Sequence, residues 1–386
     1  MNDGISFKLT EEQENLMEEA KQFAKNSIRP LIEEMNKERK LNENLVNEIK
    51  QKFSKYWVPP EYGGNYYSTI DNCIIAEELA AEYGSCLTIF EVAGLSSQPI
   101  LKGGKQEQKE KFLRPFAEGK YYFSFCLTDS GAPGSDPLAM TTTATKDGDY
   151  YILNGGKRLV TNVDFATHFL IFAKTNPEMK ARGISAFLVP KNLKGWKEIS
   201  RVQGWGMNAH FISELKFENL AVPKEFLIGN EGEGFIYSLK GLDKTRLSLA
   251  AGMCGIGREA IKIGIEYLKN HPGTFDKPLT ERQALTYKLI SLHTKVEAAR
   301  LLAWRAAKME DMGLRHSAET SMSKWFACET AVSACLTVIR MMAGDGWKND
   351  RLNIMLHDAM AFSNAQGTTQ IHKMIIGREV FKIKSL

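Results

Sequence analysis

The sequence has 386 residues and lacks several features that would place it in a specialised class. No apolar run free of charges reaches the roughly 18 residues that a transmembrane helix needs, so we expect no membrane-spanning segment. The first residues, MNDGISFKLTEEQENL, are acidic and amphipathic and contain no apolar core of a signal peptide. These absences predict a cytoplasmic protein.

Cysteine and histidine are few and scattered. No C-x-x-C pair occurs, and the apolar neighbours of the cysteines predict buried free thiols in a reducing compartment. The six cysteines are Cys73, Cys86, Cys126, Cys254, Cys328 and Cys335. None of the seven histidines forms an H-x-x-x-H or H-E-x-x-H pattern. We therefore expect no zinc or iron site.

The charge balance gives no sign of a nucleic-acid partner, because 50 Lys and Arg against 46 Asp and Glu leave a net charge of only +4. Hydrophobic residues make up 43% of the chain and charged residues 25%, which is typical of a folded globular protein. At about 150 residues per domain, the length allows two or three domains.

The hydrophobic pattern divides the chain into three parts. Residues 1–120 have a helical period, with a capping box at Thr10 and Gln13 and breaks at 59–64 and Gly84. Residues 121–232 contain short β-rich runs, and KDGDYYILNGGKR (146–158) predicts a hairpin within a small antiparallel barrel or sandwich. Residues 233–386 are again helical, with interruptions at NHPGTFDKP (270–278), MGLRHS (312–317) and AGDGWKNDR (343–351). The fold class is therefore mostly α with a central β-domain.

Eight segments carry a resemblance that covers essentially the whole chain. In order they are PPEYGG (59–64), LTDSGAPGSD (127–136), YILNGGKRLVTN (151–162), ISAFLVP (184–190), NEGEGF (230–235), LDKTR (242–246), AGDGW (343–347) and HDAMAFSNAQGTTQIH (357–372). Together they resemble the acyl-CoA dehydrogenase family. The resemblance implies an α-helical domain, a central β-domain and a C-terminal four-helix domain. It also implies an FAD enzyme, usually a homotetramer, that oxidises an acyl-CoA and passes electrons to an electron-transferring flavoprotein.

The resemblance implies roles for individual residues in FAD binding. Leu127 and Thr128 match residues at the pyrimidine edge of the flavin, and Thr161 matches a threonine near flavin N5. The expected cofactor residues are Phe125, Leu127, Thr128, Leu159, Thr161, Phe275, Arg340, Gly344, Thr368 and Gln370. Any one of these hydroxyls taken alone is more simply a turn or strand hydroxyl, and the ordered set is what favours the cofactor.

Other positions match residues that bind the acyl-CoA. Ser135 matches a serine at the CoA pyrophosphate, and LDKTR matches the segment around the adenine and pantetheine. The expected substrate residues are Thr88, Ser135, Asp243, Thr245, Arg246, Ala365 and Gly367. For Arg246 alone, the simpler interpretation is a solvated charge on a helix.

The chain departs from the family at several cofactor positions. Leu159 stands where a flavin-packing tryptophan is usual. HPGTFDKP (271–278) lacks the arginine that normally reaches the FAD of a neighbouring subunit, although Phe275 remains. Arg340 stands where a glutamine usually helps to bind the FAD of the neighbouring subunit. Its positive charge therefore either replaces that of the missing arginine or is an ordinary charge on a helix surface.

The largest departure concerns the catalytic base. The loop glutamate of the family is Gln366 here, and a carboxamide is too weakly basic to accept a proton. Some relatives carry the base in the LDKTR segment, where this chain has Thr245. The backbone N–H of Gln366 would still stabilise negative charge on the thioester oxygen. The sequence thus keeps carbonyl activation and loses both usual bases.

Glu91, in LTIFEVAGL (87–95), is the candidate replacement base. It lies on the segment that forms the floor of the acyl pocket in the family, and its apolar surroundings predict a raised pKa. Ala365 replaces a bulky tyrosine and leaves room for a ring. The combination resembles enzymes that convert cyclohex-1-ene-1-carboxyl-CoA to cyclohexa-1,5-diene-1-carboxyl-CoA by 1,4-elimination, on routes to or from benzoyl-CoA. The alternative for Glu91 is that it only lines the pocket.

Other functions remain open on sequence grounds. One is oxidation of a saturated linear or cyclic acyl-CoA. Another is a desulfinase of the same fold, which needs a pocket arginine, yet no Arg or Lys occurs between Thr69 and Leu101. An acyl-carrier-protein dehydrogenase, a flavin monooxygenase and a flavin-free acyl-CoA-binding scaffold are further alternatives.

Overall fold

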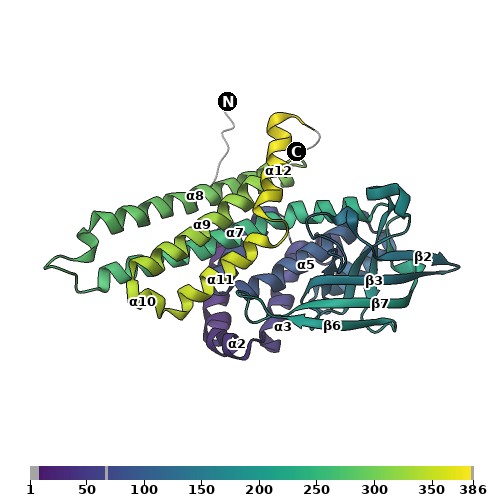
Figure 1. Ribbon diagram of the computed structural model, residues 1–386, viewed down its shortest axis with the longest axis horizontal. Helices are drawn as coiled ribbons and strands as arrows, with labels where there is room; N and C mark the ends of the chain where they lie inside the picture. Colours follow the sequence, from purple (N-terminus) through teal and green to yellow (C-terminus); the bar gives the residue numbers. More distant parts are fainter. Residues whose placement is uncertain (1–7, 66–67, 384–386) are drawn as a thin grey trace.

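A computed structural model describes residues 8–65 and 68–383 of the chain. The first seven residues of the acidic N-terminus therefore lie outside the described part. Long helices gather at one end of the molecule and a β-sheet occupies the other, with helix α5 (Gly84–Gly103) between them (Figure 1). The helical, β and helical order that the hydrophobic pattern predicts is confirmed.

The N-terminal part consists of helices, several of which pack against α5. Besides α5 they are α1 (Glu11–Phe23), α2 (Ile32–Glu38), α3 (Glu43–Phe53), α4 (Thr69–Glu82) and α6 (Gln106–Ala117). The predicted capping box is present, because the Thr10 hydroxyl accepts from the Gln13 N–H while the Gln13 side chain accepts from the Thr10 N–H. Most of α5 is buried, which suits a helix covered on several sides.

The central part is one sheet of eight strands, in the region where the sequence predicts a small antiparallel barrel or sandwich. The strands are β1 (Phe123–Cys126), β2 (Thr143–Asp147), β3 (Tyr150–Thr161), β4 (His168–Lys174), β5 (Ile184–Pro190), β6 (Trp196–Val202), β7 (Ile212–Pro223) and β8 (Leu227–Ile228). The predicted hairpin is the antiparallel β2–β3 pair. The expectation of purely antiparallel pairing is wrong, because β4 pairs in parallel with both β1 and β2.

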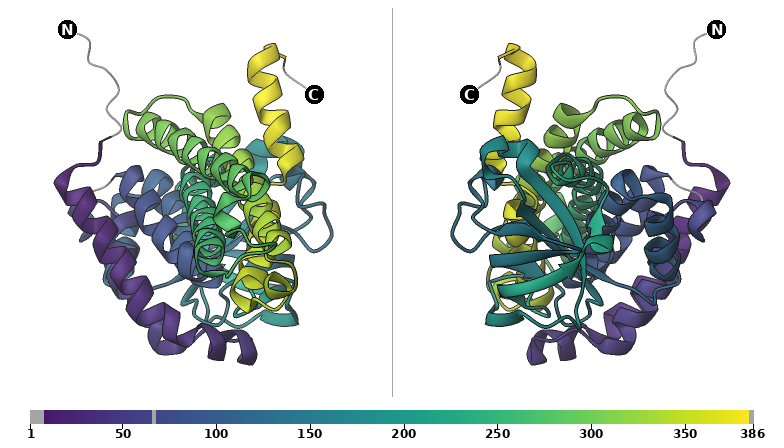
Figure 2. Two further views of the ribbon diagram at one scale, coloured as in Figure 1. Left: turned by 90° about the vertical axis from the view of Figure 1, so that its left-hand side faces the viewer. Right: turned by 90° about the vertical axis from the view of Figure 1, so that its right-hand side faces the viewer.

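The C-terminal part is a bundle of long helices. They are α7 (Gly234–Asn270), α8 (Gln283–Asp311), α9 (Ser317–Met341), α10 (Ala343–Trp347), α11 (Asp350–Asn364) and α12 (Thr369–Phe381). AGDGW, which the sequence places in an interruption of the helical pattern, forms the short helix α10. Helix α12 projects from the body of the molecule in both views of Figure 2.

Helix α7 joins the N-terminal helices to the bundle, because it packs against α4, α5, α8 and α9. Gly255 permits the close approach to α4, since a Cβ there would lie 2.1 Å from the carbonyl oxygen of Glu77. Helix α5 in turn packs against both α7 and strand β1. This packing brings the middle of α5 close to residues of α7.

The prediction of buried free thiols is confirmed by this structure. All six cysteines are buried free thiols. Within the described residues, no group of His, Cys, Asp and Glu side chains is arranged to hold a metal ion. None of the described helices combines the length and apolar character that crossing a membrane requires.

Candidate active site

Glu91 and Gln366 lie together, although 275 positions separate them in the sequence. Glu91 is on α5 and only 4% exposed, while Gln366 follows α11 in the loop before α12. Burial raises the pKa of Glu91 to about 8, against the opposing effects of the nearby Lys324 ammonium and of hydrogen bonds from Gln366 and Ser248. A carboxyl group with this pKa exchanges protons near neutrality, as a general acid or base must.

The loop that carries Gln366 is held by side chains from two helices. Gln366 adopts a left-handed backbone conformation with φ of 54°. Arg246 Nε of α7 donates to the Gln366 carbonyl oxygen at 2.9 Å, and Lys324 Nζ of α9 donates to the carbonyl oxygens of Ser363 and Gly367 at 2.8 and 2.9 Å. Buried cations thus fix three carbonyl groups of this segment.

The same loop leaves one backbone donor available. Within the described part of the chain, the Gln366 N–H makes no hydrogen bond, so it can donate to a thioester oxygen as the sequence predicts. Gly367 has a φ of 110°, and a Cβ there would lie 3.2 Å from Nε2 of His372. A side chain at position 367 would therefore disturb the loop. Ala365 packs against the main core beside it.

The predicted CoA-binding residues of α7 are already connected to each other. Arg246 is buried and its guanidinium forms an ion pair with Asp243 at 3.0 Å. Ser317 Oγ, at the start of α9, donates to Asp243 Oδ2 at 2.8 Å. Thr245 Oγ1 lies 3.0 Å from Gln366 Oε1. The LDKTR segment therefore supports the Gln366 loop directly, a role that the sequence does not reveal.

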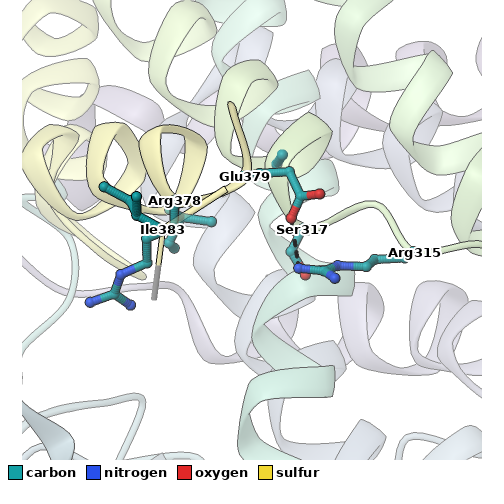
Figure 3. A pocket seen from close by; sticks show the side chains of 7 residues that line it. Arg315, Ser317, Arg378, Glu379 and Ile383 are labelled. Atoms are coloured by element: carbon teal, nitrogen blue, oxygen red, sulfur yellow. Dashed lines mark hydrogen bonds and ion pairs between the residues drawn. The ribbon is translucent and has the colours of Figure 1, made fainter. Parts of the chain in front are cut away.

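A pocket that the sequence did not predict opens beside Ser317. It has a volume of about 270 Å³, and Arg315 and Glu379 form an ion pair at its edge (Figure 3). It is lined by Arg315, Ser317, Ala318, Ile375, Arg378, Glu379 and Ile383. The Ser317–Asp243 hydrogen bond links this basic pocket to the LDKTR segment. A single arginine in the sequence does not predict such a pocket.

The predicted flavin residues of the β-domain lie where β1 and β3 end. Leu127 and Thr128 directly follow β1, and a buried ion pair between Lys157 and Asp129 holds this turn, with Lys157 Nζ also donating to the Leu127 carbonyl oxygen at 3.1 Å. Thr161 ends β3, and its carbonyl oxygen accepts from Ser124 at 2.9 Å. Phe125 packs on Phe172 with ring centroids 5.0 Å apart.

Leu159 is the most unusual of these predicted residues. It is 57% exposed and has a left-handed φ of 57°. A large apolar side chain held in this strained conformation at the surface of the sheet fits a position that a flat apolar ligand covers.

Three other predicted cofactor residues lie in a different region. Arg340 is about 24 Å along α9 from Lys324, at 1.5 Å per residue. Gly344 belongs to α10, at the end of the bundle away from the sheet (Figure 1), and Phe275 is 92% exposed in the loop between α7 and α8. A single chain does not bring these residues to the flavin residues of the sheet.

The remaining predicted residues lie on α5, in the loop after β1 and at the start of α12. Thr88 lies one turn before Glu91, but its hydroxyl donates to the Ser85 carbonyl oxygen at 2.7 Å and also contacts Nδ1 of His210. Ser135 is exposed in the loop after β1. Thr368 caps α12 by accepting from the Ile371 N–H, and Gln370 is exposed in the first turn of that helix.

Comparison with known families accounts for this arrangement. The acyl-CoA dehydrogenase N-terminal domain matches residues 10–120, the middle domain residues 124–220 and the C-terminal domain residues 232–381. The fold and site define an FAD-dependent oxidoreductase that acts on the CH–CH bond of an acyl-CoA. The chain belongs to the acyl-CoA dehydrogenase family.

Similar proteins cover nearly the whole chain. The acryloyl-CoA reductase (NADH) of Anaerotignum propionicum is 33% identical over 98% of this chain and 96% of its own. The 3-(aryl)acrylate reductase of Clostridium sporogenes is 32% identical over 97% and 99%. A solved chain in the structure of the electron transferring flavoprotein of Acidaminococcus fermentans is 32% identical, with a TM-score of 0.94 over 98% and 100%.

Proposed function

We propose that this enzyme carries out 1,4-dehydrogenation of a cyclic enoyl-CoA, cyclohex-1-ene-1-carboxyl-CoA being the substrate, with Glu91 as the base. The observation that supports this most is the position of Glu91. It is the buried carboxyl group beside the loop in which the family's glutamate is replaced by Gln366. An α,β-unsaturated substrate has no α-proton at the double bond to lose, whereas its γ-proton is acidified by conjugation.

The residues of the chain divide the work in this proposal. The Gln366 N–H donates to the thioester oxygen and stabilises the charge that develops there. Glu91, ionised, accepts the γ-proton from the floor of the cavity. Bound FAD would supply the acceptor for the hydride that leaves the far end of the conjugated system. The ammonium of Lys324 favours the ionised form of the buried Glu91 carboxyl group and so increases the fraction that is able to accept a proton.

Two regions of the fold have residues suited to binding FAD, and two have residues suited to binding CoA. The exposed Leu159 and the turn after β1 suit the flavin ring, while Arg340, Gly344 and Phe275 suit the FAD of a neighbouring subunit in a homotetramer. The basic pocket at Arg315 and Arg378, together with Ser135, suits the anionic end of CoA. Electron-transferring flavoprotein is the proposed electron acceptor and the cytoplasm the proposed location; the similar chain from the Acidaminococcus structure supports the acceptor.

A second candidate is reduction of an α,β-unsaturated acyl-CoA, which is the reverse of α,β-dehydrogenation of a saturated acyl-CoA. Since the pKa of Glu91 is about 8, this group is protonated at neutral pH and can serve as a proton donor. Two relatives are named for reduction of acryloyl-CoA and of 3-arylacrylates, which also favours this direction.

The test is anaerobic bleaching of the bound flavin by three thioesters: butyryl-CoA, cyclohexanecarboxyl-CoA and cyclohex-1-ene-1-carboxyl-CoA. We expect rapid bleaching with the last alone, and its loss in Glu91→Gln with FAD content unchanged. Full activity of Glu91→Gln would exclude Glu91 as the base. If the photoreduced enzyme is instead reoxidised faster by acryloyl-CoA or cinnamoyl-CoA than by the cyclic dienoyl-CoA, the reductase alternative is correct.

A further inference from the structure

Side chains from outside helix α5 bond to the carbonyl groups that directly precede Glu91. Asn162 Nδ2 donates to the Thr88 carbonyl oxygen at 3.1 Å. The Tyr122 hydroxyl donates to the Ile89 carbonyl oxygen at 2.9 Å and accepts from Asn162 Nδ2 at 2.7 Å. All of these residues are buried. The turn of α5 before Glu91 is therefore fixed to the segments that precede β1 and follow β3.

The orientation of the Asn162 amide follows from its partners. A carbonyl oxygen can only accept a hydrogen bond, and the Tyr122 hydroxyl proton is directed to Ile89, so both contacts of Asn162 require its NH2 group. Asn162 has a left-handed φ of 63°, which asparagine adopts more readily than most residues with a side chain. Its backbone and its side chain are thus both suited to this position.

Trp57, at the end of the 3-10 helix Ser54–Trp57, makes a third bond of this kind. Its indole Nε1 donates to the Phe90 carbonyl oxygen at 3.0 Å, and its own carbonyl oxygen accepts from Gln98 Nε2 at 3.1 Å. Its ring lies directly against α5 at Gly94, where a Cβ would come within 2.4 Å of the ring. Three consecutive carbonyl groups of α5 are thus bonded to three segments that are far apart in the sequence.

We propose that these three side chains form a clamp that positions Glu91 relative to the flavin. The clamp comprises Trp57, Tyr122 and Asn162, and the proposal rests on the proposed function, in which Glu91 accepts a proton. Asn162 directly follows Thr161, the predicted residue near flavin N5. One short segment therefore carries both the expected flavin contact and a bond to the helix of the base.

The distance between base and flavin matters because two C–H bonds of the substrate break in the proposed elimination. One bond loses its proton to the Glu91 carboxylate, and the other loses its hydride to the flavin, while the electron pair of the first forms the new double bond. Each acceptor must therefore lie within reach of its own carbon atom. A displacement of about 1 Å can lower the rate of such a reaction by about 100-fold.

The test compares variants of the FAD-loaded enzyme that each remove one donor. Tyr122→Phe removes the hydroxyl and keeps the ring, and Asn162→Gly removes the amide at a φ that glycine adopts freely. The matched control is Tyr151→Phe, which removes another buried tyrosine hydroxyl, one that donates to Glu231 outside α5. Rapid-mixing spectrophotometry at pH 9, where Glu91 is ionised, measures the rate of flavin reduction by cyclohex-1-ene-1-carboxyl-CoA.

We expect Tyr122→Phe and Asn162→Gly to slow flavin reduction at saturating substrate by about 10- to 100-fold. The apparent dissociation constant of the substrate and the FAD content should not change, and Tyr151→Phe should keep the wild-type rate. If Glu91→Gln is inactive, wild-type rates in both clamp variants overturn the proposal. If Asn162→Gly fails to fold, the comparison of Tyr122→Phe with Tyr151→Phe decides the question by itself.

A second measurement separates failure of the clamp from failure of the proposed function. Infrared difference spectra at pH 6 record the Glu91 carboxylic acid band, assigned by its absence in Glu91→Gln, and the shift of this band when the flavin is photoreduced. The shift depends on the position of Glu91 relative to the flavin, whether or not Glu91 is the base. We expect the shift to change in Tyr122→Phe and not in Tyr151→Phe.

The two measurements together assign each outcome. If Glu91→Gln keeps its flavin reduction while the shift changes in Tyr122→Phe, the proposed function fails and the clamp stands. An unchanged shift in Tyr122→Phe refutes the clamp, even if Glu91→Gln is inactive and Glu91 is the base.

Discussion

The burial of Glu91 predicts a pH-dependent effect on stability that needs no substrate to measure. The pKa of Glu91 rises from an ordinary value of 4.5 to about 8 because the folded protein removes the carboxyl group from water. Between these two pH values the folded state keeps the proton and the unfolded chain releases it. The free energy of unfolding therefore falls as the pH rises through this interval, by about 1.4 kcal/mol per pH unit, and levels off above pH 8.

Replacing Glu91 with Gln removes this dependence while keeping the size of the side chain. We expect the difference in the free energy of unfolding, Glu91→Gln minus wild type, to increase by about 1.4 kcal/mol per pH unit between pH 5 and pH 8. Asp358, whose pKa burial raises to about 7, contributes equally to both proteins and cancels in the difference.

The assay is urea denaturation of both proteins at fixed protein and FAD concentrations over this pH range. The matched control is Glu48→Gln, which makes the same substitution at an exposed position of α3. A difference for Glu91→Gln that stays constant or shrinks as the pH rises would show that Glu91 is ionised in the folded protein at neutral pH, and the reasoning about its burial would be refuted.

Three further outcomes follow from the site. The rate of flavin reduction by the enoyl-CoA should increase with pH, as Glu91 ionises, and reach a plateau above about pH 8. Rapid-mixing spectrophotometry across pH 6–9 measures this rate. A rate that does not change with pH would contradict Glu91 as the base. Lys157→Met should lower the free energy of unfolding by roughly 3–5 kcal/mol, because it leaves the buried Asp129 without its partner. The double variant Lys157→Met/Asp129→Asn should show a smaller decrease in the free energy of unfolding in the same urea titration. Gly367→Ala should slow flavin reduction at unchanged FAD content, because the left-handed φ of 110° disfavours a side chain there; wild-type rates would show that the loop tolerates it.

The arrangement of the fold could be predicted from sequence because the helical and strand periods change clearly near residues 121 and 233. The parallel pairing of β1 with β4 could not, because it joins Phe123 to His168 through contacts that leave no local pattern. The helix at Ala343–Trp347 was missed because two glycines in five residues disfavour a helix on propensity alone.

The candidate site shows the same division between local and distant information. The absence of a glutamate at position 366 and the presence of Glu91 on an apolar segment are visible in the sequence. The contact between these residues, and the bond from Thr245 to Gln366, join segments 275 and 121 positions apart. Arg315 and Arg378 line a pocket only because α9 and α12 meet. No local hydrophobic period or sequence motif encodes contacts between segments that are so far apart in the chain.

Electrostatics explains why a neutral residue at position 366 accompanies a glutamate at position 91. Two carboxyl groups side by side in a buried site cannot both ionise, because each disfavours the charge of the other. Burial already raises the pKa of Glu91 to about 8, so a second carboxyl group in the loop would move it above the range in which it can serve as a base. The amide of Gln366 has nearly the same shape and supplies a donor in place of a charge. In the proposed function, the residue at position 366 therefore determines whether the proton-accepting group lies in the loop or on helix α5.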